Sequence, residues 1–591
     1  MKFFKFYSLA LAGALMLGAC SSSDDLKDGG ATANEGKSYI AVNIKSVGTA
    51  GAGTRADYNQ GGGTYEDGTA NEGAISKVRF FFFNSDGSAY IMKGTDVNFL
   101  ELNASVSSAG EAGQLQTIEG KTTAMLVIAG NTKTAPAYMI AVVNPQTLSK
   151  LEKKAYRESQ LRDEFTDQSF VKITTDGTGN KQYGDFVMSN SVYAENGARV
   201  CASSVSGHVE GTSDAATKNP VDIYVERVVA KATTNVNTDK GWEQIASGAD
   251  NGKYKIKVGK INIDAEHEKD VYAVVQGWGL ADENRTAELE KQIDVTTNWT
   301  STTLGIDPWT TPDYHRCFWS SSVPFTPSSG SNPIVNHAFS AFTTPFGTTP
   351  LYTCPNTFTT EEFKASKNYE KPYDNTLTKV LVAAKLVYYD DDNNSHPADI
   401  CKYRGIQILG ADNVLKQVAK DHSEYWTVDP TNPSKHVLLA HTDLEYTRTN
   451  LTGSETDQLK SYEVRPVLKA GVKVYKKTSD GSFETTDSND DLNNSLAQSP
   501  VQVRKDGMTY YFTPIRHLAQ NKTEMGYYGV VRNHSYRITI NTISGFGTPV
   551  YDPDEIIDPV IPKDTETYLA ARINVLSWRV VPSSVDLDAT K

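Results

Sequence analysis

The sequence predicts a mainly β protein with two tandem β-sandwich domains, a few short helices and a further strand at the C-terminus. Three observations favour this fold class. The chain has 591 residues, enough for two or three domains with apolar cores of their own. Its aromatic residues are led by 30 tyrosines, and Thr, Ser, Val, Gly and Asn are frequent, which suits strands and turns. Short segments with alternating apolar residues recur between turn signals.

The charge of the chain argues against nucleic acid as a partner. There are 71 acidic and 58 basic residues, which gives a net charge of -13, and no basic run is available to neutralise phosphates. An acidic balance of this size is typical of a soluble protein exposed at a surface.

The first twenty residues are typical of a bacterial lipoprotein signal. Lys2 and Lys5 precede an apolar run that is too short to span a bilayer, so residues 1–19 are predicted to be a signal peptide. The run ends in "LGAC", which matches the lipobox in which the cysteine is acylated, with palmitate among the expected chains. Cys20 is therefore the predicted lipid-attachment residue. The alternative is an ordinary secretory signal followed by a chance cysteine.

Residues 20–55 are predicted to be a propeptide that contains a removable first strand. In "SYIAVNIKSV", Ile40, Val42 and Ile44 alternate with polar or small residues, which is the pattern of a strand with one buried face. Burying three such side chains stabilises the docked strand by roughly 1.5 to 3 kcal/mol each. We therefore expect this segment to pack on a sheet.

A glycine-rich segment with one arginine follows that strand. It reads "GTAGAGTRADYNQGGG", and Arg55 is the only arginine before Arg79. Loops of small and polar residues are preferred sites of proteolysis. One hypothesis is that an arginine-specific protease cuts between Arg55 and Ala56 and frees the first strand. The alternative is a linker with an incidental arginine, and this segment alone does not decide between them.

The body of the chain is predicted to divide near residue 285. Residues 56–285 form the first predicted β-sandwich, with a helix over residues 145–165, and the polar stretch 281–299 is interpreted as a domain junction. Residues 286–550 form the second predicted sandwich, with one helix near residues 411–422.

Residues 551–591 are predicted to be a linker followed by a C-terminal donor strand. The linker is acidic and rich in proline, which stiffens it and keeps it out of a central strand position. The strand has a first apolar set and then, after a slip in phase, a second one. The first set is Leu569, Ala571, Ile573 and Val575, and the second is Leu576, Trp578 and Val580. We expect this strand to fill a groove elsewhere, because its own domain has no obvious need for it.

Several of these features, in their order along the chain, resemble a known family. The lipobox, the arginine loop after a first strand, "VERVVAKATT", "YTCPNTF", "GYYGVVRNHSYRITINTISGFGTP" and the terminal "INVLSWRVV" are similar to the type V fimbrillin family of Bacteroidales, and to the major structural subunit of the short (minor) fimbriae. The resemblance runs from Cys20 to the end of the chain. The acidic "SSSDD" after Cys20 resembles the tag that exports lipoproteins to the outer face of the outer membrane.

The resemblance implies transthyretin-like sandwiches and assembly by donor-strand exchange. An arginine-specific cysteine protease would cut after Arg55, and the open groove of the first domain would accept the C-terminal strand, Tyr568 to Val581, of another copy. The implied partners are further copies in a head-to-tail filament, fimbrial anchor and tip subunits, and host or bacterial surface receptors. The implied location is a cell-surface fimbrium, with the precursor lipid-anchored to the outer membrane.

Other candidate sites have simpler explanations. Cys201, Cys317, Cys354 and Cys401 can be free thiols or include one disulfide, and both readings stay open. The acidic segments 390–399 and 487–494 offer oxygen ligands to calcium, but they lack the full loop pattern, so solvated turns are favoured. His315 and Cys317 suggest a catalytic pair, yet structural roles are favoured for both.

The sequence therefore predicts a structural protein and no enzyme, cofactor or metal site. No GxSxG, HExxH, P-loop or helix-opening GxGxxG motif is found in the sequence. The predicted function is a fimbrial shaft subunit that polymerises by protease-triggered strand exchange and, by resemblance, mediates adhesion, biofilm formation and virulence. The alternatives are a monomeric surface lipoprotein that binds glycan or host protein, with its C-terminal strand folded back, and a fimbrial tip or anchor subunit.

Overall fold

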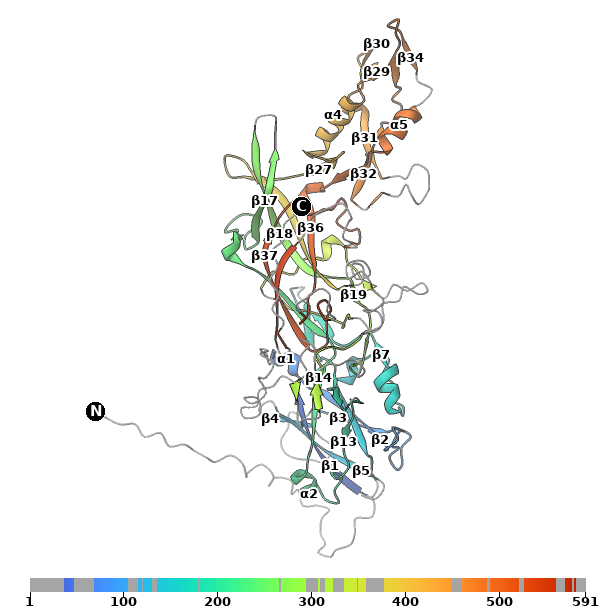
Figure 1. The fold of residues 1–591 in the computed structure, drawn as a ribbon, viewed down its shortest axis with the longest axis vertical. Helices are drawn as coiled ribbons and strands as arrows, with labels where there is room; N and C mark the ends of the chain where they lie inside the picture. Colours follow the sequence, from blue (N-terminus) through green and yellow to red (C-terminus); the bar gives the residue numbers. More distant parts are fainter. Residues whose placement is uncertain are drawn as a thin grey trace, which may run out of the picture.

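The computed structural model shows a mainly β protein with several sheets and a few short helices, which confirms the predicted fold class. The molecule is elongated, with the N-terminal sheet at one end, a second sandwich in the middle and a smaller module at the far end (Figure 1). The structure describes residues 37–46, 68–104, 115–118, 121–129, 135–178, 181–196, 198–264, 267–293, 307–308, 314–322, 334–347, 349–357, 377–448, 459–460, 462–485, 489–519, 526–557, 559, 569–576 and 579–580.

The N-terminal domain is built on one long sheet whose strands enclose a common core. In spatial order its strands are β3 (Phe99–Asn103), β2 (Lys77–Phe83), β6 (Tyr138–Val143), β10 (Met188–Asn190), β14 (Val221–Arg227), β1 (Lys37–Ser46), β5 (Lys121–Ala129) and β4 (Leu115–Ile118), with β13 (Ser203–Ser204) paired to β6. Alternate residues of β1, β2, β6 and β14 are buried in one apolar cluster. The period of two along each strand places these side chains on the same face.

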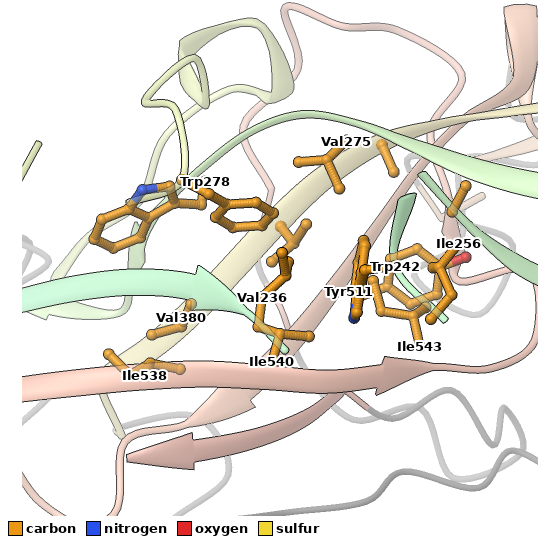
Figure 2. Packing of buried hydrophobic residues seen from close by; sticks show 14 of the residues in the cluster. Val236, Trp242, Ile256, Val275, Trp278, Val380, Tyr511, Ile538, Ile540 and Ile543 are labelled. Carbon is orange, nitrogen blue, oxygen red and sulfur yellow. The ribbon is translucent and has the colours of Figure 1, made fainter. Parts of the chain in front are cut away.

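The middle of the molecule is a second sandwich of two sheets. One sheet has the order β24 (Leu351–Thr353), β15 (Ala230–Val236), β37 (His534–Ile543), β39 (Leu569–Leu576) and β40 (Arg579–Val580). The other has the order β16 (Glu243–Gln244), β17 (Tyr254–Asn262), β18 (Glu268–Ala281), β25 (Lys379–Tyr389), β36 (Met508–Pro514) and β38 (Thr548–Pro549), with β26 (Ser395–Pro397) paired to β25. Figure 2 shows their shared core, in which Trp278 and Val380 lie near Ile538 and Ile540 of β37.

Strand β18 approaches a neighbouring loop so closely that only glycine fits at one position. A Cβ atom added at Gly277 would lie 2.3 Å from the carbonyl oxygen of Phe342. We expect Gly277→Ala to lower the free energy of unfolding by about 1 to 3 kcal/mol, because the overlap forces the packed backbone apart. Chemical denaturation followed by tryptophan fluorescence measures this loss. Gly184→Ala is the matched control, since no atom lies within 4 Å of the added Cβ there, and an equal effect at both glycines would contradict the packing argument.

A third module with its own core lies at the far end of the molecule, and the sequence analysis did not predict it. Its first sheet has the order β28 (Ile406–Leu409), β27 (Ile400–Tyr403), β35 (Val501–Val503), β32 (Glu463–Leu468) and β31 (Leu444–Thr447). Its second has the order β30 (Asn432–Leu438), β29 (Tyr425–Asp429), β33 (Tyr475–Lys477) and β34 (Phe483–Thr485). Helices α4 (Ala411–Asp421) and α5 (Asn489–Ala497) complete it. The chain enters this module after β26 and returns to β36, so the module is an insertion in the second sandwich.

One of the two predicted helices is present and the other is wrong. Helix α4 covers the segment predicted near residues 411–422, and it buries Val414, Leu415, Val418 and Ala419 on one face. Residues 145–165 contain only a 3-10 turn, Pro145–Thr147, and a short π-helical turn, Gln160–Glu164. The apolar residues between them pack into a core cluster from an irregular path instead of forming a helical stripe.

The predicted boundary at residue 285 also differs from the structure. Strands β15 to β18, which the sequence analysis assigned to the first domain, pair with one another and with strands of the second half of the chain. The change of domain lies between β14 and β15. Residues 281–293 are not an exposed junction, because Leu289 and Glu290 are fully buried there. Polar composition misled the prediction, since Asp282 and Lys291 of this stretch are buried and paired with Lys379 and Glu226.

Further short strands and helices lie outside the sheets of the three modules. The remaining strands are β7 (Thr166–Asp167), β8 (Lys172–Thr175), β9 (Lys181–Gly184), β11 (Tyr193–Glu195), β12 (Ala198–Val200), β19 (Glu283–Asn284), β20 (Ala287–Glu288), β21 (Asp307–Pro308), β22 (Tyr314–Arg316) and β23 (Ile334–Val335). The remaining α-helices are α1 (Ala70–Gly73) and α2 (Ser213–Lys218). Within the described part of the chain, no helix has the length and apolar character needed to cross a bilayer.

Candidate functional site

Strand β1 occupies an interior position of the N-terminal sheet although it lies at the start of the described chain. It runs antiparallel to β5, from Lys37 opposite Ala129 to Ile44 opposite Thr122. On its other side it runs parallel to β14, from Val42 opposite Val221 to Ser46 opposite Val225. A strand with partners on both sides closes the ladder of the sheet. Removal of β1 would therefore expose two sheet edges at once.

The inward face of β1 fills an apolar groove between β5 and β14. Ile40, Val42 and Ile44 are 0%, 1% and 3% exposed, and they belong to the core cluster of the domain. Burial of three aliphatic side chains contributes roughly 5 to 9 kcal/mol to docking of the strand before ordering costs. The groove that β1 occupies is thus a complete strand-binding site.

The outward face of β1 makes polar contacts along β14 and the loop before it. The Nδ2 atom of Asn43 donates a hydrogen bond of 2.9 Å to the carboxylate of Asp222 on β14. Tyr39 and Glu210 exchange two backbone hydrogen bonds of 2.8 and 2.9 Å. Helix α2 lies between Glu210 and β14 and contacts β1. Segment 207–219, which includes α2, therefore continues the contacts of β1 beyond the N-terminal end of β14.

The C-terminal strand β39 is paired within its own chain. It runs antiparallel to β37, with Val575 opposite Tyr536, Ile573 opposite Ile538 and Ala571 opposite Ile540. Tyr536, Ile538 and Ile540 all point into the core of the second sandwich. The expectation that this strand has no place in its own domain is therefore wrong for the single chain, in which β39 completes the sheet next to β37.

A buried charged cluster joins the two domains at the end of β14. The Nζ atom of Lys291 lies 3.0 Å from a carboxylate oxygen of Glu226, and the Nε atom of Arg532 lies 3.3 Å from the other oxygen. Arg532 also donates to the backbone oxygen of Leu289 and to Ser189 Oγ, at 2.8 and 2.9 Å. All three charged side chains are at most 3% exposed. The cluster fixes β14, which lines the groove, to the segment that leads into β37.

The same cluster holds a further acidic side chain. Glu290 is fully buried, and burial raises the pKa of its carboxyl well above the usual value, although the charge of Arg532 acts in the opposite direction. A protonated Glu290 lets the cluster carry fewer negative charges in a dry environment. The arrangement is that of a structural junction between domains.

The predicted site residues fall into three groups in the structure. Ile40, Val42 and Ile44 are the buried residues of β1. Leu569, Ala571, Ile573, Val575 and Leu576 belong to β39, and Val580 belongs to β40. Cys20, Arg55, Ala56 and Trp578 lie outside the described residues. The roles predicted for all of these residues remain proposals.

The four cysteines in the described part of the chain are free and buried, and no disulfide links them. Burial raises the pKa of the thiols of Cys317 to about 11 and of Cys354 and Cys401 to about 12. A raised thiol pKa is the opposite of what nucleophilic catalysis requires. The suggested pairing of His315 with Cys317 as a catalytic dyad therefore has no support from the chemistry of the thiol.

The acidic segments considered for calcium form other structures. The Asp390 carboxylate accepts a 2.7 Å hydrogen bond from the backbone of Asn394 and lies 2.8 Å from His396 Nε2, which closes a turn. Helix α5 begins within the second segment, at Asn489. Among the described residues, no group of three or more His, Cys, Asp or Glu side chains is placed to hold a metal ion.

Sequence reasoning missed the polar residues that organise the groove and the junction. Asp222 stands between Val221 and Ile223, so the period of two already placed it on the outer face of a buried strand. Glu226 and Arg532 stand in the segments "YVERVV" and "VVRNH", where a charge interrupts an apolar run. Charges in such runs are the available signal for a buried ion pair.

The fold and the groove define a class of protein: β-sandwich proteins whose first domain is completed by a strand from the N-terminal segment of the chain. Residues 503–583 match the family model described as major fimbrial subunit protein type IV, fimbrillin, C-terminal. Over these residues the chain is similar to the fimbrillin family, which supports the resemblance found in the sequence. The match spans β36 to β40, which all belong to the second sandwich.

Solved structures with some likeness include a proposed cell adhesion protein of Parabacteroides distasonis, with 11% identity, 91% of this chain and 96% of that chain covered, and a TM-score of 0.31. A proposed cell adhesion protein of Bacteroides eggerthii has 12% identity, coverage of 91% and 96%, and a TM-score of 0.30. The tip fimbrial protein Mfa3 of Porphyromonas gingivalis, with C-terminal truncation, has 10% identity, coverage of 92% and 100%, and a TM-score of 0.26. These likenesses carry no inference of their own. No curated protein matches the chain.

Proposed function

We propose that this chain is a structural shaft subunit of cell-surface fimbriae that polymerises by protease-triggered donor-strand exchange and mediates adhesion and biofilm formation. The observation that carries the proposal is the interior position of β1 between β5 and β14. A strand held there by backbone pairing and apolar burial leaves an open groove when it departs. A groove of this kind binds another strand by the same main-chain hydrogen bonds.

The order of events follows from how β1 is attached. Before cleavage, β1 is covalently connected to its own domain, which gives it an effective concentration in the millimolar range, roughly, as for a short flexible linker. A cut between Arg55 and Ala56 removes that advantage, and β1 is then diluted when it dissociates. The incoming strand from a second copy, proposed here to be β39, competes only with free propeptide.

Strand exchange also requires β39 to leave its own domain. In the single chain it is paired on β37, and β15 pairs with β37 on the other side. Release of β39 leaves β37 with a partner on one side, so the second sandwich keeps most of its sheet. The interface that forms when β39 enters another copy is head-to-tail and does not close, so repetition produces a filament.

The proposed maturation pathway also assigns roles to the lipid anchor, the cleavage site and the partners. Cys20 would anchor the precursor to the outer membrane until cleavage after Arg55 separates the subunit from its lipid. The partners would be further copies, fimbrial tip and anchor subunits, the arginine-specific cysteine protease, and host or bacterial surface receptors. The fimbrillin match indicates a structural subunit, and no catalytic role is assigned to any residue.

One observation favours a second candidate function. Because β39 is folded back on β37 of its own chain, the structure is also compatible with a monomeric surface lipoprotein that binds glycan or host protein. Such a protein would keep β1 in place and would have no use for cleavage at Arg55. A terminal fimbrial subunit, at the tip or the anchor, would use only one of the two strands.

Cleavage distinguishes these functions. We expect an arginine-specific protease to convert the purified precursor, produced without residues 1–20, into a species that begins at Ala56 and forms a ladder of oligomers. N-terminal sequencing and size-exclusion chromatography measure both changes. Arg55→Ala and deletion of residues 568–591 should each abolish the ladder. A cleaved product that stays monomeric and retains β1 would favour the monomeric lipoprotein instead.

A further inference from the structure

The register of β1 in its groove is marked by a polar pair on the outer face of the sheet. Asn43 lies opposite Asp222 in the parallel pairing with β14, and its side-chain amide donates to the Asp222 carboxylate at 2.9 Å. A slip of β1 by two residues would keep its apolar face inward but would move Asn43 away from Asp222. Apolar alternation alone does not distinguish such registers, whereas this pair does.

The proposed donor strand contains a matching tripeptide. β1 carries Val42-Asn43-Ile44, and β39 carries Ile573-Asn574-Val575, so in both an asparagine stands between two β-branched residues. Superposition of the two asparagines places Leu569–Leu576 on positions 38–45, which lie within the bounds of β1, Lys37–Ser46. The two strands therefore fit the same length of groove.

We propose that Asn574 of the incoming strand takes over the hydrogen bond of Asn43 to Asp222, and that this bond sets the register in which β39 of a second copy fills the groove. The inference rests on the proposed function and names a specificity-determining pair within it. Asp222 is the fixed partner, and Asn43 and Asn574 are its successive donors. The incoming strand runs in the direction of β1, parallel to β14.

This register gives the apolar groove four apolar side chains. Positions 38, 40, 42 and 44, which carry Ser38, Ile40, Val42 and Ile44 in β1, receive Leu569, Ala571, Ile573 and Val575. Three branched aliphatic residues and one small residue are present in each set, so the total volume is nearly conserved. Cores tolerate redistribution of volume far better than its loss.

Other placements of the strand fit less well. A shift by two residues that places Leu576 at the position of Asn43 brings Ser577 to the position of Ile44. A donor strand that runs in the reverse direction, with Asn574 kept at the position of Asn43, brings Ser577 to the position of Ile40, which is 0% exposed. A hydroxyl without a partner in such a site is costly. The opposite shift carries Leu576 beyond Ser46, the end of β1.

The register also places an arginine near two acidic residues. Arg572 takes the position of Ala41, which faces away from the core cluster but is only 8% exposed, between Tyr39 and Asn43. The backbone of Tyr39 is bonded to Glu210, and Asn43 is bonded to Asp222. A long side chain can extend from this covered position to the acidic groups on either side. β1 has only alanine there, so the propeptide strand makes no such contact.

Cysteine cross-linking tests the register directly. Adjacent strands lie about 4.8 Å apart, which suits a disulfide between residues that face each other. Four double variants of the precursor without residues 1–20 are cleaved, polymerised and oxidised: Asp222→Cys with Asn574→Cys, Asp222→Cys with Leu576→Cys, Asp222→Cys with Arg572→Cys, and Tyr224→Cys with Leu576→Cys. The native cysteines of the described chain are buried and free, so background cross-linking is low.

The pairs 222 with 574 and 224 with 576 are expected to give ladders on non-reducing gels. In the proposed register Asn574 lies opposite Asp222, as Asn43 does in the single chain, and Leu576 lies opposite Tyr224, as Lys45 does. Ladders from the second or third pair would overturn the register, and a ladder from the first pair without the last would overturn the direction. If polymer forms but none of the four pairs cross-links, the proposed register is wrong and the proposed function stands. If the unsubstituted chain does not polymerise after cleavage, the proposed function fails, and the inference fails with it.

A charge variant gives a second readout that does not depend on thiols. Asn574→Asp places two carboxylates opposite each other, and we expect polymerisation after cleavage to slow by about fivefold, as for like charges across a strand pair. Asp222→Asn in the same chain should restore the rate. Asp222 is exposed on β14 and Asn574 lies in the C-terminal tail, so we expect both variants to fold. Folding of each precursor is verified before the polymerisation rate is measured. A slow Asn574→Asp that Asp222→Asn does not rescue would contradict the pairing.

Discussion

An aspartate in place of Val42 is expected to let the uncleaved precursor polymerise. Val42 is 1% exposed in the core of the N-terminal domain, where it faces the groove between β5 and β14. Burial of an unpaired carboxylate there costs several kcal/mol, about 3 to 5 by analogy with broken buried pairs. That lowers the occupancy of the groove by β1 roughly 100- to 4000-fold and opens it to β39 of another copy without proteolysis.

Size-exclusion chromatography of the intact Val42→Asp precursor measures this effect. Tyr39→Ser is the matched control, since Tyr39 lies on the outward face of the same strand, is only half-buried, and bonds to Glu210 through its backbone. The control precursor should remain monomeric until it is cleaved. A monomeric Val42→Asp precursor whose β1 amides stay protected from hydrogen exchange would show that occupancy of the groove does not control assembly.

Removal of a buried ion pair in the second sandwich is expected to have the largest effect on stability. Lys379 is 0% exposed and pairs with the side chain of Asp282, which also accepts a 3.0 Å hydrogen bond from Asn336. Lys379→Ala removes the ammonium group and leaves the carboxylate buried. We expect the free energy of unfolding to fall by about 3 to 5 kcal/mol, as measured by urea denaturation followed by fluorescence.

An exposed pair on the same domain provides the comparison. The Nζ atom of Lys260 lies 2.7 Å from a carboxylate oxygen of Glu268, and about half of each side chain is exposed. Lys260→Ala should cost at most about 1 kcal/mol, since solvent screens such pairs. Asp282→Asn in the Lys379→Ala background should recover part of the loss, because the amide carries no charge. Equal losses at Lys379 and Lys260 would contradict the buried-pair account.

The sequence predicted those parts of the fold in which local pattern and tertiary environment agree. The alternation in β1 marks the face that is buried, and the stripe of Val414, Leu415 and Val418 marks helix α4. The lipobox, the arginine loop and the terminal strand pointed to the fimbrillin family through their residues and their order along the chain. Each of these signals depends on neighbours within one short segment.

Features that depend on distant partners could not be predicted. Strands β15 and β37 pair although their residues lie some three hundred positions apart in the chain. Nothing in the sequence of either strand indicates that the other is its partner. The polar stretch 281–299 was interpreted as a domain junction, because the sequence does not show that Lys291 is buried against Glu226 of β14, which also pairs with Arg532 before β37. The inserted module was missed for the same reason, since its core brings together residues as far apart in the chain as Cys401 and Val503.

The location of β39 was the most instructive difference. Its apolar alternation predicts a strand that must be covered, and it says nothing about whether its own β37 or a second copy covers it. In the single chain the partner is β37. The groove at β1 is the site where an alternative partner becomes available after cleavage.

A cryo-EM map of the polymer formed by the cleaved protein tests the central claim most directly. The account predicts that the strand between β5 and β14 has the side chains of residues 569–576, connects to the linker of the neighbouring subunit, and replaces residues 37–46. A map in which residues 37–46 still occupy that position, or in which every β39 remains paired with β37 of its own chain, would contradict strand exchange as the basis of assembly.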